Sequence, residues 1–279
     1  TLCLDPLAVE RALSPRTRGL LPVHLYGHPA DMDPLLSIAR DRGLFVLEDA
    51  AHAVPARYKG LAIGTIGTAT AFSFYATKNM TTAEGGMLTG GPELLTKARM
   101  WSLHGLDRDA YNRYSAEGSW YYEVVLPGFK CNMTDIQASI GLQQLKKLPR
   151  FQARRRQIVD RYQAAFGAVE SLEIPIERHN VESAWHIYAL RLRLEALSIG
   201  RARFIDEMKA RNIGTSVHFI PVHLHPYYRD KYHYAPSDYP VAYENYQRLV
   251  SLPLHPNLSD SDVDDVIEAV ADVVTKHRR

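Results

Sequence analysis

The stretch that most constrains this chain runs from Gly67 to Gly91 and reads GTATAFSFYATKNMTTAEGGMLTGG. Its first part, residues 68–75, has small, β-branched and aromatic side chains without charge or proline, which is typical of a short strand buried on both faces. Lys78 follows, and a second short apolar run comes at residues 87–89. An amine at the mouth of a buried strand is partly desolvated, which favours its neutral, nucleophilic form. The stretch therefore predicts a reactive lysine where a buried strand ends.

Taken alone, Lys78 is more simply interpreted as a surface lysine in a loop, and its context decides against this interpretation. Upstream, residues 43–52 read GLFVLEDAAH, an apolar strand that delivers the carboxylate of Asp49 at its carboxyl end. In open α/β sheets, ligands bind outside this edge. Asp49, together with Ser73 and Lys78 at a second junction of strand and loop, therefore predicts a cofactor site.

The order of elements in the first half of the chain predicts a doubly wound, mostly parallel sheet. Residues 19–25 and 44–47 suit buried strands, and Asp33 caps a helix between them, with Gly43 after its last turn. A strand, a helix and a strand in this order give parallel strands with a right-handed crossover. Four further elements are expected: a helix within residues 1–13, strands at 69–75 and 87–89, and a helix at 92–102.

Residues 134–166 predict two helices separated by Pro149. Thr134 and Gln137 have the spacing of a capping box. The first helix carries an apolar stripe that includes Ile136, Ile140, Leu145 and Leu148. The second helix, at 150–166, is basic, and its arginines 154–156 suit a solvated face better than a binding patch. We therefore expect a cofactor-binding large domain, 1–150, and a small C-terminal domain, 151–279.

The C-terminal part alternates signals of strands and helices, as in an α+β layer. Strands are expected at 186–194 and 215–220, and helices at 202–211 and 260–276. Four histidines here lack the spacing of a zinc helix and have no accompanying cysteines or carboxylates, so we expect no metal site; they are His218, His223, His225 and His233. An irregular segment at 103–125 is expected to be functional or mobile, and its aromatic residues are Tyr111, Tyr114, Trp120, Tyr121 and Tyr122.

Composition excludes several classes of function. The 279 residues are 46% apolar and 23% charged with a net charge of +2, so nothing indicates binding to nucleic acid or to an anionic membrane. The two cysteines, Cys3 and Cys131, cannot form a disulfide scaffold. No apolar run has the length of a membrane span, and the amino terminus lacks a signal pattern, so we expect a cytoplasmic protein.

Six stretches of the chain together resemble the DegT/DnrJ/StrS-type sugar aminotransferases, which are fold-type I pyridoxal-phosphate enzymes that aminate keto sugars. They occur in the family's order and reach nearly from end to end: PVHLYGHPADMD (22–33), VLEDAAHA (46–53), FSFYATKNMTTAEGGM (72–87), GFKCNMTDIQASIGLQQL (128–145), SVHFIPVHLHPYY (216–228) and LPLHPNLSDSDVDDVIEAV (252–270). The resemblance implies the fold-type I α/β fold and pyridoxal 5'-phosphate as the cofactor.

The resemblance also implies a role for each residue of the predicted site. Lys78 matches the family's Schiff-base lysine, and Asp49 matches the residue that pairs with the pyridinium nitrogen of the cofactor. His52 stands where many members have glutamine, near the ring hydroxyl, and a core histidine is its alternative interpretation. Ser73 matches a donor to the cofactor's phosphate, and a plain buried strand serine is its alternative.

Lys130 and Asn132 lie where family members carry polar residues that reach the phosphate in the neighbouring subunit. Many members have asparagine and arginine in that motif, whereas this chain reads GFKCNM at 128–133. The resemblance thus implies a homodimer with two-fold symmetry, in which each active site is completed in trans. Members also begin with a segment that contributes to phosphate binding, and nothing in residues 1–19 resembles it. We therefore expect an N-terminally incomplete large domain that binds pyridoxal phosphate weakly by itself.

The function that the resemblance implies is transfer of an amino group from glutamate to a nucleotide-linked keto sugar. The motifs EDAAHA (48–53) and GFKCNMTDIQA (128–138) resemble most the branch of the family that acts on 4-keto sugars. A second hypothesis keeps the cofactor but replaces transamination by dehydration or epimerisation of the sugar. Dehydrating members have histidine in place of the Schiff-base lysine, so Lys78 argues against it. A third hypothesis is a non-catalytic relative, either a regulatory, cofactor-binding protein or a truncated copy.

Overall fold

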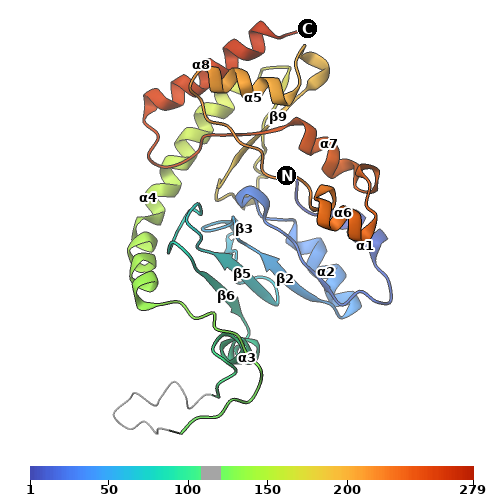
Figure 1. The fold of residues 1–279 in the computed structure, drawn as a ribbon, viewed down its shortest axis with the longest axis vertical. Helices are drawn as coiled ribbons and strands as arrows, with labels where there is room; N and C mark the ends of the chain where they lie inside the picture. The colour runs from blue at the N-terminus through green and yellow to red at the C-terminus, as the bar shows by residue number, and fades with distance from the viewer. Residues whose placement is uncertain (108–120) are drawn as a thin grey trace. The chain divides into compact units, whose positions relative to one another are not determined.

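The computed structural model describes residues 1–107 and 121–279, so Tyr111, Tyr114 and Trp120 of the predicted aromatic segment lie outside the described residues. The described chain forms two compact units (Figure 1). We call residues 2–148 with 180–184 the N-terminal unit. The remainder, chiefly 149–179 and 185–279, is the C-terminal unit. Within the described ranges, no helix is long and apolar enough to cross a membrane.

A four-stranded sheet of order β1-β2-β5-β6 forms the centre of the N-terminal unit (Figure 1). Strands β1, β2 and β5 run parallel, and β6 pairs antiparallel with β5 at the edge. The register places Asp49 opposite Ala71. The strands are β1 (Gly19–Leu20), β2 (Phe45–Asp49), β5 (Ala69–Ser73) and β6 (Gly86–Gly90). The prediction of an α/β fold with a mostly parallel sheet is confirmed.

Strand β1 is much shorter than the strand predicted at 19–25, so that prediction is wrong in length. Pro22 has no N–H with which to extend the ladder, and Tyr26 has a φ of 58° in a 3-10 turn, η1 (Leu25–Gly27). Val23 nevertheless forms a single parallel bridge with Asp49. The chain therefore stays beside β2 up to the point where Asp49 emerges.

Helix α2 (Met32–Arg42) forms the predicted crossover between β1 and β2 and contacts both strands. It begins after Asp31, so Asp33 lies in its first turn and is not the cap that the sequence suggested. Gly43 ends it in the left-handed region with a φ of 61°, as expected for a glycine at this position. Two further helices of the unit match their predictions: α1 (Pro6–Ala12) and α3 (Pro92–Ser102).

The core of the N-terminal unit lies between α2 and the sheet, and a second small sheet closes it. Fully buried Met32 and Leu35 of α2 pack in the same cluster as Val46 of β2. The second sheet is antiparallel with the order β4-β3-β8. It brings the late segment 180–184 into this unit, and its strands are β3 (Arg57–Tyr58), β4 (Leu61–Ala62) and β8 (Val181–Glu182).

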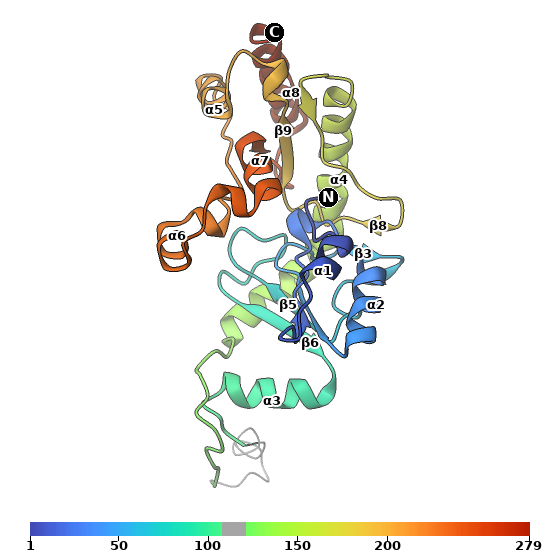
Figure 2. The ribbon, with the colours of Figure 1, turned by 90° about the vertical axis from the view of Figure 1, so that its right-hand side faces the viewer.

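The C-terminal unit has an antiparallel sheet of order β10-β9-β7 covered by helices, which is the predicted α+β layer. Helix α5 contacts both α8 and the sheet (Figure 2). The strand predicted at 215–220 is wrong, because only one bridge forms there, between Ser216 and Ser251. The elements are β7 (Leu172–Glu173), β9 (Tyr188–Leu192), α5 (Arg201–Ala210), η3 (Leu194–Ala196), η4 (Val222–Leu224), α6 (Pro226–Tyr232), η5 (Pro236–Asp238), α7 (Pro240–Arg248), β10 (Leu249–Leu252) and α8 (Asp260–Lys276).

One helix, α4 (Asp135–Phe166), replaces the two helices that were predicted around Pro149. Proline removes one hydrogen bond from a helix interior, which weakens the helix without forcing it to end. Buried side chains on both sides of the proline hold α4 in place, with Leu148 packed in the N-terminal unit and Ile158 in the C-terminal unit. The capping box is confirmed, since the Gln137 N–H donates to the hydroxyl of Thr134 and the Thr134 N–H donates back to the amide oxygen of Gln137.

The arginines of α4 are not the solvated face that was expected. Arg155 is only 5% exposed, and its guanidinium donates to three backbone carbonyls, those of Trp185, His186 and Leu254. Burial lowers the pKa of Arg155 to about 10. Arg154 donates to a carbonyl of the same unit, and Arg156 forms a two-pronged ion pair with Glu177. The prediction that these arginines lie on a helix is confirmed. The prediction that they face solvent is wrong, because their hydrogen-bond partners lie far away in the sequence.

Candidate active site

The carboxyl ends of β2 and β5 carry the first two predicted site residues. Asp49 is the last residue of β2 and Ser73 the last of β5, and the two strands are hydrogen-bonded neighbours. Beyond the strand, the Ala50 N–H still donates to the Ala71 carbonyl at 2.9 Å. The carboxylate of Asp49 accepts a bond of 2.9 Å from the Ala51 N–H, which holds the side chain against the turn that follows. Both residues therefore lie at the sheet edge where ligands bind in α/β folds.

Lys78 lies in the loop that follows β5. A turn fixes its backbone, because its N–H donates to the Tyr75 carbonyl at 3.0 Å. The side chain is half-buried, and this burial lowers the pKa of the Lys78 amine, while the negative charge of Asp49 raises it in part. The net lowering enlarges the neutral fraction of the amine at a given pH. The half-buried position of Lys78 agrees with the partial desolvation that the sequence predicted for an amine at a strand end.

The loop between β5 and β6 is held in shape by Phe74. Its N–H donates to the Gly85 carbonyl at 2.8 Å, and its carbonyl accepts from the Thr82 N–H at 2.9 Å. Thr81 adds a bond from its hydroxyl to the same carbonyl. A side chain at Gly86 would place its Cβ 2.6 Å from the Phe72 carbonyl oxygen, so only glycine fits there. The threonines and glycines after Lys78, to which the sequence analysis gave no role, therefore fix the loop that carries the lysine.

His52 lies three residues beyond Asp49 and is half-buried. Its Nδ1 accepts a hydrogen bond of 3.3 Å from the Tyr26 N–H, and the two rings are nearly parallel with centroids 6.4 Å apart. A nitrogen that accepts from a backbone N–H carries no proton, so the proton of a neutral ring is on Nε2. The structure fixes the orientation of His52 within the N-terminal unit.

Lys130 and Asn132 interact with each other, the amine donating to the side-chain oxygen of Asn132. Both side chains are exposed. Among the bonds of the described residues, none connects this pair with Lys78 or Asp49. The single chain therefore brings together Lys78, Asp49, Ser73 and His52 in one unit, and it leaves Lys130 and Asn132 on its surface.

A buried pair that the sequence analysis did not single out lies directly beneath this edge. His24 and Glu48 have fully buried side chains, and Nε2 of His24 lies 2.9 Å from a carboxylate oxygen of Glu48. The other oxygen of Glu48 accepts from the Gly67 N–H and the Thr70 hydroxyl, each at 2.7 Å. Burial raises the pKa of Glu48, but these hydrogen bonds outweigh it and lower the pKa overall. The sequence held one signal for this pair, because Glu48 is a charged residue within an otherwise apolar strand, directly before Asp49.

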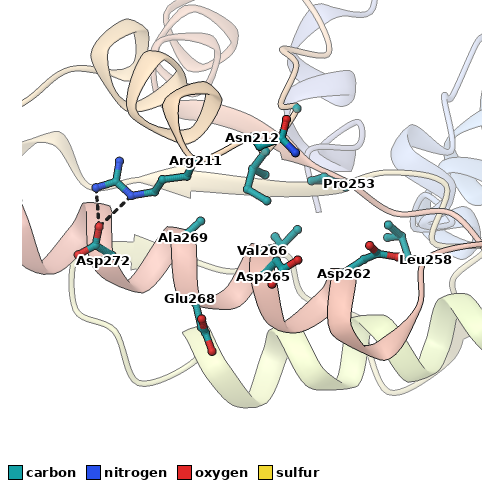
Figure 3. Close-up of a pocket in the computed structure, with 12 residues that line it drawn as sticks. Arg211, Asn212, Pro253, Leu258, Asp262, Asp265, Val266, Glu268, Ala269 and Asp272 are labelled. Carbon is teal, nitrogen blue, oxygen red and sulfur yellow. Dashed lines mark hydrogen bonds and ion pairs between the residues drawn. The ribbon is translucent and has the colours of Figure 1, made fainter.

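A pocket of about 590 Å³ lies elsewhere, in the C-terminal unit (Figure 3). Acidic residues of α8 line it, including Asp262, Asp265 and Glu268, and Arg211 closes one end by pairing with Asp272. None of the predicted site residues contributes to this pocket. The pocket therefore lies apart in the sequence from the predicted site residues at the ends of β2 and β5.

A pyridoxal cofactor needs an amine for its aldehyde, an anion beside its ring nitrogen and donors for its phosphate. Lys78 supplies a half-buried amine of lowered pKa, Asp49 an anion close enough to act on that amine, and Ser73 a hydroxyl at the next strand end. These residues fit the cofactor. The fold and these residues are those expected of an α/β enzyme of the pyridoxal-phosphate type.

The chain belongs to the DegT/DnrJ/EryC1/StrS aminotransferase family, whose family model matches residues 1–271. It is 53% identical over 276 residues to the spore coat polysaccharide biosynthesis protein SpsC of Bacillus subtilis, covering 98% of this chain and 71% of SpsC. The protein is thus an aminotransferase, and the family expected from the sequence is confirmed.

Solved structures agree with this assignment. Spr1654 from Streptococcus pneumoniae, described as a sugar aminotransferase, is similar in its PMP-form with a TM-score of 0.90 and 35% identity, over 99% of this chain and 74% of that chain. PseC of Helicobacter pylori, an aminotransferase involved in the biosynthesis of pseudoaminic acid, has a TM-score of 0.89 at 25% identity, over 98% and 71%. The family and the PLP-form of Spr1654 imply pyridoxal phosphate as the cofactor here.

Proposed function

We propose that this protein transfers the amino group of glutamate to a nucleotide-linked 4-keto sugar, with pyridoxal phosphate as its cofactor. The observation that carries the proposal is the position of Asp49 at the end of β2, beside β5 and the half-buried Lys78 in the loop that follows β5. Two relatives support a sugar substrate, since SpsC is a spore coat polysaccharide biosynthesis protein and PseC is an aminotransferase involved in the biosynthesis of pseudoaminic acid. A cytoplasmic location, expected from the sequence, is part of this proposal.

Lys78 has two tasks in this reaction. Pyridoxal phosphate, when bound, supplies an electron sink for the electrons left on the substrate carbon. Nζ of Lys78 would hold the cofactor through its aldehyde carbon and, as a free amine, would carry the proton at the substrate carbon. Partial burial supports both tasks, because a lowered pKa favours the neutral amine that acts as nucleophile and as base.

Asp49 and its neighbours are proposed to bind and orient the cofactor. The carboxylate of Asp49 would pair with the ring nitrogen and hold it in its protonated form, which strengthens the electron sink. His52, oriented by the Tyr26 N–H, would lie near the ring hydroxyl. Ser73, at the end of β5, would donate its hydroxyl to the phosphate. These assignments are supported by position, because Asp49 and Ser73 end neighbouring strands and His52 follows three residues after Asp49.

Lys130 and Asn132 are proposed to reach the phosphate of a second copy of the chain, so that two subunits complete each active site. Their surface position supports this proposal, since neither is engaged with the site of its own chain in the described bonds. Exposed apolar residues lie close to them in the sequence, with Phe129 65% exposed and Ile136 76% exposed. Exposed apolar groups of this size are typical of an interface between proteins.

Lys78→Ala tests the assignment of the reactive lysine. The variant is expected to lose turnover almost completely, because it lacks both nucleophile and proton carrier. Borohydride reduction of the wild-type protein with pyridoxal phosphate, followed by peptide mapping, should find the pyridoxyl group on Lys78. Lys59 and Lys97 are the controls, since both are paired with carboxylates on the surface. A pyridoxyl group on either of them would contradict the assignment.

The substrate is tested by offering glutamate together with nucleotide-linked 4-keto and 3-keto sugars in parallel. We expect formation of 2-oxoglutarate and of an amino sugar with the 4-keto compound. Turnover with the 3-keto compound alone would refute the proposed position of amination, while the proposal of a sugar aminotransferase would stand. Absence of turnover with both, in protein that carries the cofactor on Lys78, would refute the proposed class of substrate.

A further inference from the structure

Asn79, the residue directly after Lys78, is a buried polar residue that the proposed reaction does not use. Its side chain is only 8% exposed. Its amide nitrogen donates two hydrogen bonds to backbone carbonyls, one to Val54 at 3.1 Å and one to Ala184 at 2.8 Å. Ala184 lies 105 residues away in the sequence. A single side chain thus joins the lysine loop to two other segments of the N-terminal unit.

The first of these bonds leads to Asp49. Val54 lies directly after a short turn in which the Ala51 N–H donates to the carboxylate of Asp49 and the Ala53 N–H to the Ala50 carbonyl. The turn leaves little freedom between Asp49 and Val54, because these bonds are local and Ala53 is only 1% exposed. A bond from Asn79 to Val54 therefore ties the loop of the lysine to the loop of its carboxylate.

The second bond leads to His52. The N–H of Ala184 donates to the Gly27 carbonyl at 2.9 Å, and Gly27 follows Tyr26, whose N–H donates to His52. Asn79, Ala184, Gly27, Tyr26 and His52 are thus linked through short connections of backbone and side chain. The amide of Asn79 is therefore linked to the segments that carry Lys78, Asp49 and His52.

An amide is the group that suits this position. Its nitrogen carries two hydrogens, and the two carbonyls each require one donor. Aspartate offers no donor when ionised and would oppose both carbonyls, and leucine has the same shape but no donor. Met80, which follows, is also buried, in a cluster with Phe74 and Leu148. Two consecutive buried residues therefore anchor the loop directly behind the half-exposed Lys78.

We infer that Asn79 is a positioning residue, which fixes the amine of Lys78 relative to Asp49 by hydrogen-bonding both loops to the segment at Ala184. The role of this placement in catalysis rests on the proposed function. The placement itself is a property of the chain without cofactor and can be measured there. When the anchor is lost, the loop should open and Lys78 should become better hydrated, so that its amine is protonated to a larger extent.

The test compares Asn79→Leu with Asn79→Ser, which keeps one donor and leaves space for water. Competitive labelling of the cofactor-free protein with an amine-reactive reagent, read by mass spectrometry, reports the reactivity of Lys78 at a series of pH values. We expect the labelling of Lys78 at pH 8 to fall about threefold or more, the change that half a pKa unit produces. The Kd for pyridoxal phosphate should rise in the same variants. Asn245→Leu is the matched control, because Asn245 donates to the Val241 carbonyl in the C-terminal unit.

Unchanged reactivity of Lys78 and unchanged Kd in a folded Asn79 variant would overturn the inference. Failure of both variants to fold would also overturn it, because a positioning residue leaves the fold intact. The proposed function can fail separately. If the wild-type protein shows no transamination but the Asn79 variants still change the reactivity of Lys78, the proposed function is refuted and the positioning role of Asn79 stands. A loss of Lys78 reactivity in Asn245→Leu as well would show a general effect of destabilisation and contradict the inference.

Discussion

The role proposed for Lys78 requires a neutral amine, and two opposing effects act on the pKa of that amine. Burial lowers the pKa of its amine, and the charge of Asp49 raises it. Burial has the larger effect, so the amine titrates below its ordinary value of 10.5. A lysine that is charged in the folded chain is therefore destabilising near neutral pH, and its contribution to stability improves as pH rises through the lowered pKa.

Asp49→Asn removes the charge from this pair and keeps its shape. We expect the variant to retain pyridoxal phosphate but to lose about a hundredfold or more in turnover, since an uncharged partner no longer keeps the ring nitrogen protonated. Steady-state kinetics and cofactor titration separate the two effects. Asp41→Asn, on the exposed face of α2, is the control and should behave as wild type. Turnover of Asp49→Asn within a few-fold of wild type would contradict the pairing.

Glu48 is a buried carboxylate whose partners determine its charge. His24 accepts the Ala30 N–H at Nδ1 with 3.0 Å, so its proton is on Nε2 and is donated to Glu48. Together with Gly67 and Thr70, three donors face the carboxylate and only its ionised form satisfies all of them. The pKa of Glu48 accordingly lies below its ordinary value of 4.5.

Glu48→Gln is therefore expected to lower the free energy of unfolding at pH 7 by about 2 kcal/mol, because the amide nitrogen would oppose the proton of His24. A lowered pKa stabilises the fold fully above pH 4.5, and this contribution is lost as pH falls through the pKa of the folded state. The difference between wild type and variant should thus shrink below pH 4.5 in urea unfolding. Glu10→Gln, on the exposed surface of α1, is the control. A difference that stays constant with pH would argue against an ionised Glu48.

At the scale of elements, helix ends follow their local sequence closely. Ser259 caps α8, its hydroxyl accepting from the Asp262 N–H at 3.1 Å while the Asp262 carboxylate accepts from the Ser259 N–H at 2.7 Å. Hydrogen bonds from Ser259 lower the pKa of Asp262. Such a reciprocal pair satisfies two backbone donors that a helix leaves unbonded. The boundary of α8 at residue 260 was accordingly predicted from sequence.

Ser259→Ala is expected to lower the free energy of unfolding by about 1 kcal/mol, the usual cost of removing a cap. Ser261→Ala is the matched control, because Ser261 lies in the first turn of the same helix and its side chain is exposed. It should leave stability unchanged or raise it slightly, since alanine favours helices. Urea unfolding of both variants measures the comparison. Equal effects of the two substitutions would show that the cap does not contribute.

At the scale of the whole molecule, the proposed dimer makes a prediction about mixtures. Lys78→Ala and Asn132→Ala should each be inactive or nearly so as a homodimer. In a mixed dimer, one site combines both intact residues, so an equal mixture that exchanges subunits should recover up to about a quarter of wild-type activity. Lys78→Ala mixed with Asp49→Asn is the control, because both residues come from one subunit and no intact site can form. No recovery in an exchanging mixture would contradict a site completed in trans.

The sequence by itself determined what depends on near neighbours along the chain. The cap at Thr134, the glycine that ends α2 and the start of α8 at residue 260 follow from spacings of a few residues. For the same reason the family motifs around Lys78 were recognisable. Helix and turn signals are local, because the groups that satisfy each other lie within one or two turns of the backbone.

Tertiary structure decided everything that depends on partners far apart in the sequence. Burial of Arg155 depends on carbonyls 30 to 99 residues away, and the two bonds of Asn79 span 25 and 105 residues. The passage of α4 through Pro149 likewise depends on packing at both ends, which outweighs one missing hydrogen bond. A sequence pattern shows that a polar residue can form a bond, but only the folded chain brings its partner close and removes the water that competes for it.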